Sequence, residues 1–236
     1  MASYTQISDS KAKEILALYG LENIKKTTPI SSGISNTNYA IELADGNQIV
    51  LKISNSKPTH SIKDEQAILF HLNLHGFDKC LVPLKTLEGS DVYEYEGLSG
   101  VIYPFIQGNI PEINIQNIHK IGVAIAELHL VKVDEHSKLR HFSELGCDFE
   151  HILEYINGPD CPPPFKNYFI DLIDADWVNR YLASEFKQSI IHGDLYYDNC
   201  LFSSSGDLLT VLDFEQSGIG YPLFDIGISI SGCCLK

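Results

Sequence analysis

Four polar side chains in the last quarter of the sequence have the types and spacing that phosphoryl transfer requires. The segment IIHGDLYYDNCLF contains His192, Asp194 and Asn199, and the next segment, LLTVLDFE, contains Asp213. Such a reaction needs a carboxylate to orient the attacking hydroxyl and oxygen ligands to hold magnesium over nucleotide phosphates. Asp194 suits the first task, and Asn199 with Asp213 suits the second. A loop followed by a hairpin return would bring these residues to one edge.

The same residues also have a simpler interpretation. His-Gly-Asp by itself is a turn, and Asp-Asn by itself is a helix cap. Against this, the four residues occur in the order and spacing of a kinase, downstream of a strand that carries Lys52. We therefore interpret them as a candidate catalytic site.

The elements that must position this site begin with a sheet-rich region. Capping residues at 8–10 predict a first helix that stops at Gly20, and Ser61 predicts a second helix that stops at Gly76. The turn Ala-Asp-Gly-Asn joins two of the strand-like runs as a hairpin. The predicted strands are 25–30, 39–43, 48–53, 81–84 and 98–103. This pattern indicates an antiparallel sheet with a helix packed on it.

Helices dominate after Tyr103. Apolar spacing predicts a helix over 115–130, and the triplet Pro162 to Pro164 separates it from another over 165–186. Short strands are predicted at 190–191, 200–202 and 208–212. We therefore divide the chain into residues 1–103, a hinge at 104–108, and a helical region at 109–236.

Composition narrows the class of protein. The 17 Lys and Arg against 31 Asp and Glu give a net charge of −14, which repels nucleic acid and anionic lipid. This charge suits a cationic small molecule, although it also serves solubility. The sequence has no signal peptide pattern, no apolar run of membrane-spanning length and no C-x-x-C pair among its 6 cysteines. We expect a cytoplasmic protein with reduced thiols and a small-molecule partner, of unknown oligomeric state.

The motifs resemble a known family. HGDLYYDN is similar to the H-G-D-L-x-x-x-N loop of the aminoglycoside and choline kinase-like phosphotransferases, and VLDFE to their magnesium-binding I-D-F/W-E segment. PISSGISNTNYAI resembles the G-G-x-x-N-T-N-Y opening of the homoserine kinase-like branch. The Asp198-Asn199 pair resembles the D-L-F-x-D-N loop of the same branch. The similarity spans 25–230. It implies an α+β, two-lobed protein-kinase-like fold with an antiparallel sheet in the N-lobe and a mainly helical C-lobe.

The resemblance assigns roles to the polar residues. It makes Asp194 the catalytic base or orienter, and Asn199 and Asp213 the magnesium ligands. It makes Lys52 the partner of the α- and β-phosphates of ATP, held by an ion pair with Glu65. From the strand alone, Lys52 is equally well a surface lysine, and the neighbouring Asp64 competes with Glu65 for its role.

The nucleotide site would involve two further segments. Residues 31–38 depart from a glycine-rich loop, but their backbone N–H groups and small hydroxyls could cradle phosphate. In the hinge, the Pro104 carbonyl and the Ile106 N–H would meet adenine. Without a nucleotide, these segments are a polar hairpin and a strand-to-helix connector. The candidate phosphate-binding residues are Ser32, Asn36, Thr37 and Asn38.

The catalytic loop would also face the acceptor. If it folds as in the family, Tyr196 and Asp198 lie on the acceptor side, and Asp198 could bind a substrate ammonium group. Alternatively, that carboxylate bonds its own loop backbone. We assign structural roles to His192, through hydrogen bonds to the loop, and to Asp225, whose family counterpart buttresses the loop.

The resemblance therefore implies transfer of a phosphoryl group from ATP, with magnesium, to a hydroxyl of a small amino alcohol. L-Homoserine, as in threonine biosynthesis, is the first choice, and an aminoglycoside or a choline-like compound is the alternative. A catalytically silent nucleotide-binding module is the alternative from another class. The chain ends soon after the D-I-G-I-S segment, whereas relatives continue into further helices. We expect a truncated chain or an unusually open acceptor pocket.

Overall fold

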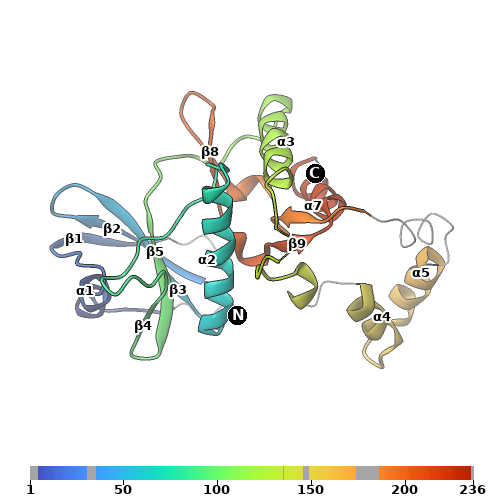
Figure 1. The fold of residues 1–236 in the computed structure, drawn as a ribbon, viewed down its shortest axis with the longest axis horizontal. Helices are drawn as coiled ribbons and strands as arrows, with labels where there is room; N and C mark the ends of the chain where they lie inside the picture. The colour runs from blue at the N-terminus through green and yellow to red at the C-terminus, as the bar shows by residue number, and fades with distance from the viewer. Residues whose placement is uncertain (1–4, 31–35, 135, 146–148, 174–185, 235–236) are drawn as a thin grey trace.

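The computed structural model describes residues 5–30, 36–134, 136–145, 149–173 and 186–234. Ser32 and residues 174–185 of the helix predicted over 165–186 therefore lie outside the described residues. Within the described ranges, a sheet-rich N-terminal part is followed by a mainly helical part, which confirms the α+β prediction (Figure 1).

The N-terminal part is an antiparallel five-stranded sheet with the order β1-β2-β3-β5-β4. Helix α1 (Asp9–Ala17) packs Ile15 and Leu16 on one face, and helix α2 (Thr59–Leu74) lies between the other face and the helical part (Figure 1). The strands are β1 (Ile24–Ile30), β2 (Asn36–Leu43), β3 (Gln48–Ser54), β4 (Tyr93–Tyr95) and β5 (Leu98–Pro104).

The turn between β2 and β3 forms as predicted, since Gly46 adopts a positive φ of 90° there. Two other predictions were wrong. Residues 81–84 are not a strand, because Pro83 has no N–H to donate to a sheet. The N–H of Leu84 donates to Ile102 O of β5, but the edge strand that pairs with β5 is β4. Helix α2 begins before Ser61, and the N–H of Ser61 already donates to Pro58 O at 3.0 Å.

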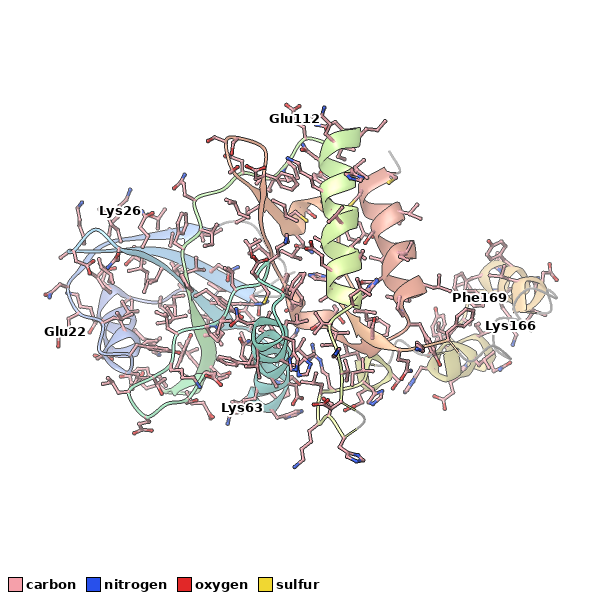
Figure 2. The ribbon with its side chains drawn as sticks, turned by 45° about the horizontal axis from the view of Figure 1, so that its top comes forward. Glu22, Lys26, Lys63, Glu112, Lys166 and Phe169 are labelled. Carbon is pink, nitrogen blue, oxygen red and sulfur yellow. The ribbon has the colours of Figure 1, made fainter. Side chains whose placement is uncertain are left out.

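The second part is built around α3 (Ile115–His129) and α7 (Pro222–Cys234), which pack against each other beside two small antiparallel sheets. Helices α4 (Phe149–Asn157) and α5 (Pro163–Ile173) project away from this body (Figure 1). Lys166 and Phe169 of α5 therefore lie at the end of the molecule opposite Lys26 of β1 (Figure 2). The small sheets pair β6 (Ser189–Ile191) with β9 (Gly218–Gly220), and β7 (Cys200–Phe202) with β8 (Leu208–Val211).

Helix α5 starts two residues earlier than predicted. Its first residue is Pro163, within the proline triplet that we expected to precede the helix. Proline is tolerated in a first helical turn because the N–H groups there have no partner within the helix. The triplet therefore contributes to the start of this helix as well as separating it from α4.

Candidate active site

The loop that follows β6 is held by one buried carboxylate. Asp225, in the first turn of α7, accepts hydrogen bonds from the backbone N–H of His192 at 2.9 Å and of Gly193 at 2.8 Å. His129, the last residue of α3, also contacts Asp225, with Nε2 at 2.9 Å from Oδ2. Burial alone would raise the pKa of Asp225, but these partners outweigh burial and lower it. Asp225 therefore remains charged and fixes the base of the loop.

The glycine of His-Gly-Asp is required by its surroundings. Gly193 has a φ of +82°, and a Cβ there would lie 2.4 Å from the carbonyl oxygen of Gln216. Only glycine has both the conformational freedom and the small size that this position demands. The loop is thus pressed against the segment that follows Asp213.

His192 joins the same two segments through its ring. Its Nδ1 accepts from the N–H of Asp194 at 3.2 Å, so Nε2 carries the proton that is donated to Leu212 O at 2.8 Å. The ring also packs on Phe214, with centroids 4.7 Å apart. These contacts agree with the structural position expected for His192, between the catalytic loop and the segment of Asp213.

Asn199 lies between Asp194 and Asp213. Its Nδ2 donates to the backbone carbonyl of Asp194 at 2.8 Å, which leaves its Oδ1 as the oxygen that could bind a cation. Its own carbonyl accepts from the N–H of Leu212 at 2.7 Å, at the return of the β7–β8 hairpin. Asp213 follows in the left-handed region, with a φ of 61°, and its side chain is 38% exposed. The hairpin thus brings the predicted metal ligands together, as the spacing suggested.

Lys52 connects the sheet to this site. Its Nζ lies 3.4 Å from Glu65 Oε1 and 3.3 Å from Asp213 Oδ1. Burial alone would lower the pKa of Lys52, but the carboxylates of Glu65 and Asp213 outweigh burial and raise it. The partner of Lys52 on α2 is therefore Glu65, as the resemblance implied, and not Asp64.

The charges around Asp194 fit a cation site. Burial raises the pKa of the Asp194 carboxyl; His192 opposes this shift, while the like charges of Asp213, Glu215 and Asp198 add to it. Among the described residues, no three His, Cys, Asp or Glu side chains form a metal site on their own. One Asp and one Asn fit magnesium nonetheless, since this ion usually keeps water and takes its other ligands from phosphates.

The predicted phosphate-binding residues do not all face Lys52. Asn38 pairs with Lys52 across β2 and β3, and Asn36 lies two positions away on the same face. Thr37 points to the opposite face, where it is fully buried and its hydroxyl donates to Asn55 Oδ1. Its side chain is thus not in the site. At the hinge, Pro104 is exposed at the end of β5 and Ile106 is half-buried after it.

Of the two predicted acceptor-binding residues, Tyr196 is half-buried and Asp198 is exposed. The ring of Tyr196 lies against the backbone of α7, where a Cβ on Gly232 would come within 2.3 Å of Tyr196 Cδ1. The Asp198 carboxylate is therefore the more accessible of the two candidates.

Two residues that the sequence reasoning missed complete the site. Glu215 Oε2 lies 2.8 Å from Lys57 Nζ and accepts from Asn36 Nδ2 at 2.9 Å. Burial alone would raise the pKa of Glu215, but Lys57, Lys52 and Asn36 lower it. Glu215 could have been found, because it belongs to the VLDFE motif. Lys57 gives no signal in the sequence, since its partner is reached only through the fold.

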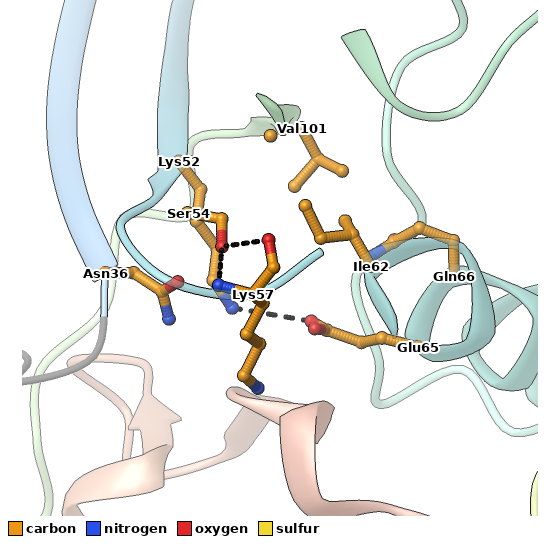
Figure 3. A pocket seen from close by; sticks show the side chains of 9 residues that line it. Asn36, Lys52, Ser54, Lys57, Ile62, Glu65, Gln66 and Val101 are labelled. Atoms are coloured by element: carbon orange, nitrogen blue, oxygen red, sulfur yellow. Dashed lines mark hydrogen bonds and ion pairs between the residues drawn. The ribbon is translucent and has the colours of Figure 1, made fainter. Parts of the chain in front are cut away.

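A small cavity adjoins Lys52, between β3, β5 and α2 (Figure 3). Gln66 lines it, and its Oε1 accepts from the hydroxyl of Tyr103 at 3.1 Å. Its amide nitrogen is buried and has no hydrogen-bond partner among the described residues. The lining residues are Asn36, Lys52, Ser54, Lys57, Ile62, Glu65, Gln66, Gly100 and Val101.

Known proteins are similar to this chain in sequence. The profile of the phosphotransferase enzyme family (APH) matches residues 26–234. The homoserine kinase of Nitrobacter hamburgensis is 24% identical over 240 residues, which cover 100% of this chain and 72% of that protein. None of the helices in the described ranges is long and apolar enough to cross a membrane.

Solved structures share the fold. A microcompartment-associated aminopropanol kinase has a TM-score of 0.70 at 17% identity, covering 94% of this chain and 74% of that one. Spectinomycin phosphotransferase in complex with ADP and spectinomycin has a TM-score of 0.64 at 17% identity, covering 94% of this chain and 73% of that one. These likenesses extend over both the sheet-rich and the helical part.

Proposed function

The chain belongs to the phosphotransferase enzyme family and is a small-molecule kinase, and from this premise we propose that it transfers the γ-phosphoryl group of ATP, with magnesium, to a hydroxyl of a small amino alcohol. The first candidate acceptor is L-homoserine. The observation that carries the proposal is the position of Lys52, which lies within 3.4 Å of both Glu65 and Asp213. This geometry is suited to holding nucleotide phosphates beside a metal ligand.

Each residue of the site has a role in this reaction. Asp194 accepts a hydrogen bond from the acceptor hydroxyl and orients its oxygen toward the γ-phosphorus. Asn199 and Asp213 would hold magnesium, which neutralises charge on the phosphates. Lys52 binds the α- and β-phosphates, and Glu65 keeps its side chain extended toward them.

Other segments bind the rest of the substrates. Residues 1–103 carry the nucleotide site, including Asn36 and Asn38 on the face of Lys52, and Ser32 with the backbone near Thr37. Pro104 and Ile106 of the hinge at 104–108 meet adenine through backbone groups. Residues 109–236 bind the acceptor, with Tyr196 and Asp198 at its site.

The choice of acceptor rests on two supports. The curated relative above is named homoserine kinase, and the aminopropanol kinase with the same fold is named for another amino alcohol. In addition, the exposed carboxylate of Asp198 and the net charge of −14 suit an ammonium group. Aminoglycosides and choline share that group, so they are the alternative acceptors.

Release of ADP with a panel of acceptors tests the proposal. The panel contains L-homoserine, 1-amino-2-propanol, choline, kanamycin and spectinomycin, each with and without magnesium. We expect L-homoserine to give the highest kcat/KM and omission of magnesium to abolish turnover. Turnover of another member only would reassign the acceptor. Binding of ATP without turnover of any member would support a silent module instead.

A further inference from the structure

The carboxylate of Glu215 connects the sheet-rich part to the segment that carries Asp213. Its Oε2 receives hydrogen bonds from Asn36 Nδ2 and Lys57 Nζ, at 2.9 and 2.8 Å. Glu215 itself is 8% exposed, so this contact is largely removed from water. Figure 3 shows Lys57 extending from below β3 toward the ribbon of the C-terminal part.

On the sheet side, the residues that contact Glu215 lie beside the end of β3, the strand that carries Lys52. The backbone N–H of Lys57 donates to Ser54 Oγ at 3.1 Å, and Ser54 is the last residue of β3, two positions after Lys52. Asn36 is the register partner of Ser54 on β2. Both donors to Glu215 are therefore fixed to the end of the strand that presents Lys52.

On the other side, the backbone of Glu215 is held by a buried arginine. The guanidinium of Arg140 donates to the carbonyl oxygens of Glu215 at 2.7 Å and Ser217 at 2.6 Å, and to that of Phe214 at 3.3 Å. Arg140 is 7% exposed. The segment after Asp213 is thus attached to the C-terminal part by Arg140. Its contacts with the end of the sheet are made by the side chain of Glu215.

The ion pair between Lys52 and Asp213 cannot serve as a lasting connection. When nucleotide and metal bind, Lys52 Nζ must turn to phosphate and Asp213 must turn to the metal. The contacts of Glu215 use no atom of either residue, so binding of nucleotide and metal does not require them to break. They can therefore keep the phosphate-binding lysine at a constant distance from the metal-binding segment.

We propose that Glu215 is a positioning residue that sets the affinity for the metal-nucleotide complex by joining Lys57 and Asn36 to the segment of Asp213. This inference rests on the proposed function, because it concerns the nucleotide site of that reaction. Asn36 then contributes to the nucleotide site through its hydrogen bond to Glu215. Binding energy is gained because the site is already arranged before the ligand arrives.

The test is a double-mutant cycle on nucleotide binding, which requires no acceptor. Calorimetry measures the Kd of magnesium-AMP-PNP for the wild type, Glu215→Gln, Lys57→Met and the double variant. We expect each single change to weaken binding by about tenfold or more, and the double change to weaken it hardly further, because the two residues act as one unit. Asn36→Ala should behave like Lys57→Met in the same cycle.

A matched control uses another glutamate paired with a lysine. Glu42 of β2 pairs with Lys25 on the exposed edge of the sheet, so Glu42→Gln should leave the Kd unchanged. If Glu215→Gln does not fold, as judged by its melting temperature without ligand, the test rests on Lys57→Met and Asn36→Ala. Additive losses of nucleotide affinity from these two changes would overturn the proposal.

Two results separate failure of this inference from failure of the proposed function. Absence of nucleotide binding by the wild type would refute the proposed function. Tight binding by the wild type together with an unchanged Kd for Glu215→Gln would overturn the inference alone. Additive losses in the cycle would also overturn it, because Lys57 would then contact the nucleotide independently of Glu215.

Discussion

Lys52 Nζ lies 3.3 Å from Asp213 Oδ1, although 161 positions separate the two residues in the sequence. The amine also lies 3.4 Å from Glu65, whose side chain is only 5% exposed. One ammonium group therefore faces two carboxylates before any ligand binds. This arrangement makes Lys52 a determinant of stability as well as of turnover.

Replacement of Lys52 should therefore destabilise the fold. Lys52→Met leaves the Glu65 carboxylate buried without its partner, so we expect the free energy of unfolding to fall by about 3 kcal/mol or more. Urea unfolding measures this loss. The double variant Lys52→Met/Glu65→Gln should recover part of it, since the buried Glu65 carboxylate is then no longer present without a partner. Lys25→Met, which breaks an exposed pair, should cost about 1 kcal/mol or less; an equal cost for both lysines would contradict the prediction.

Replacement of Asp194 should separate catalysis from nucleotide binding. Asp194→Asn removes the carboxylate that orients the acceptor hydroxyl, so we expect kcat to fall by a factor of about 10² to 10⁴. Affinity for magnesium-nucleotide should change by less than about threefold, since the expected ligands Asn199 and Asp213 remain. ADP release and calorimetry measure the two effects. Asp78→Asn, at an exposed carboxylate, is the control, and near wild-type turnover by Asp194→Asn would remove Asp194 from the mechanism.

Gly193 offers a test of how tightly the catalytic loop is packed. Gly193→Ala and Gly206→Ala both place a Cβ on a backbone with a φ of +82°, so they share the conformational cost of about 1 kcal/mol. Only the first meets a neighbour, Gln216 O at 2.4 Å, whereas nothing lies within 4 Å of the second. We expect Gly193→Ala to cost about 1 to 3 kcal/mol more in urea unfolding, and to lower kcat. Equal stabilities would show that the loop can move away from Gln216 freely.

The contribution of Asp225 should depend on pH. Its pKa is lower in the folded protein than in the unfolded chain, so its charged form stabilises the fold above the unfolded pKa of about 4, and this stabilisation is lost as pH falls through the folded value. Asp225→Asn should therefore be less stable than the wild type at pH 7, by about 2 to 4 kcal/mol. The difference should shrink below about pH 4. Thermal unfolding across pH 3 to 7 measures it, and a difference that stays constant down to pH 3 would contradict the lowered pKa.

Much of this arrangement could be predicted from local patterns. The alternation along residues 39–43 and 48–53, with an Asp-Gly turn between them, gave the hairpin that carries Lys52. The expected pairing of Lys52 with Glu65 is confirmed by the distance, since Glu65 faces the sheet from α2 and is buried. The hairpin depends on periodicity, which a single sequence displays directly, whereas the pairing of Lys52 with Glu65 was implied by the family resemblance.

The remaining features depend on contacts between distant segments. Thr37 was grouped with Asn36 and Asn38 by its neighbourhood in the sequence, but strand alternation places its side chain on the other face. Likewise, the contact between Asn36 and Glu215 spans 179 positions, and no local pattern reports it. Leu81–Leu84 has the composition of a strand, but Pro83 has no N–H to donate, and only Leu84 bonds β5, at Ile102 O.

The catalytic loop combines fixed ends with an accessible middle. Gly193 is tied to Asp225 at one end, and Asn199 is tied to Asp194 O and to Leu212 at the other, while Asp198 between them is exposed. The side chain of Asp198 can be exchanged without displacing the ends, whereas Leu195 is buried and Tyr196 packs against α7. A directed-evolution library aimed at new acceptors should therefore randomise Asp198 and keep Gly193, Asp194 and Asn199 constant.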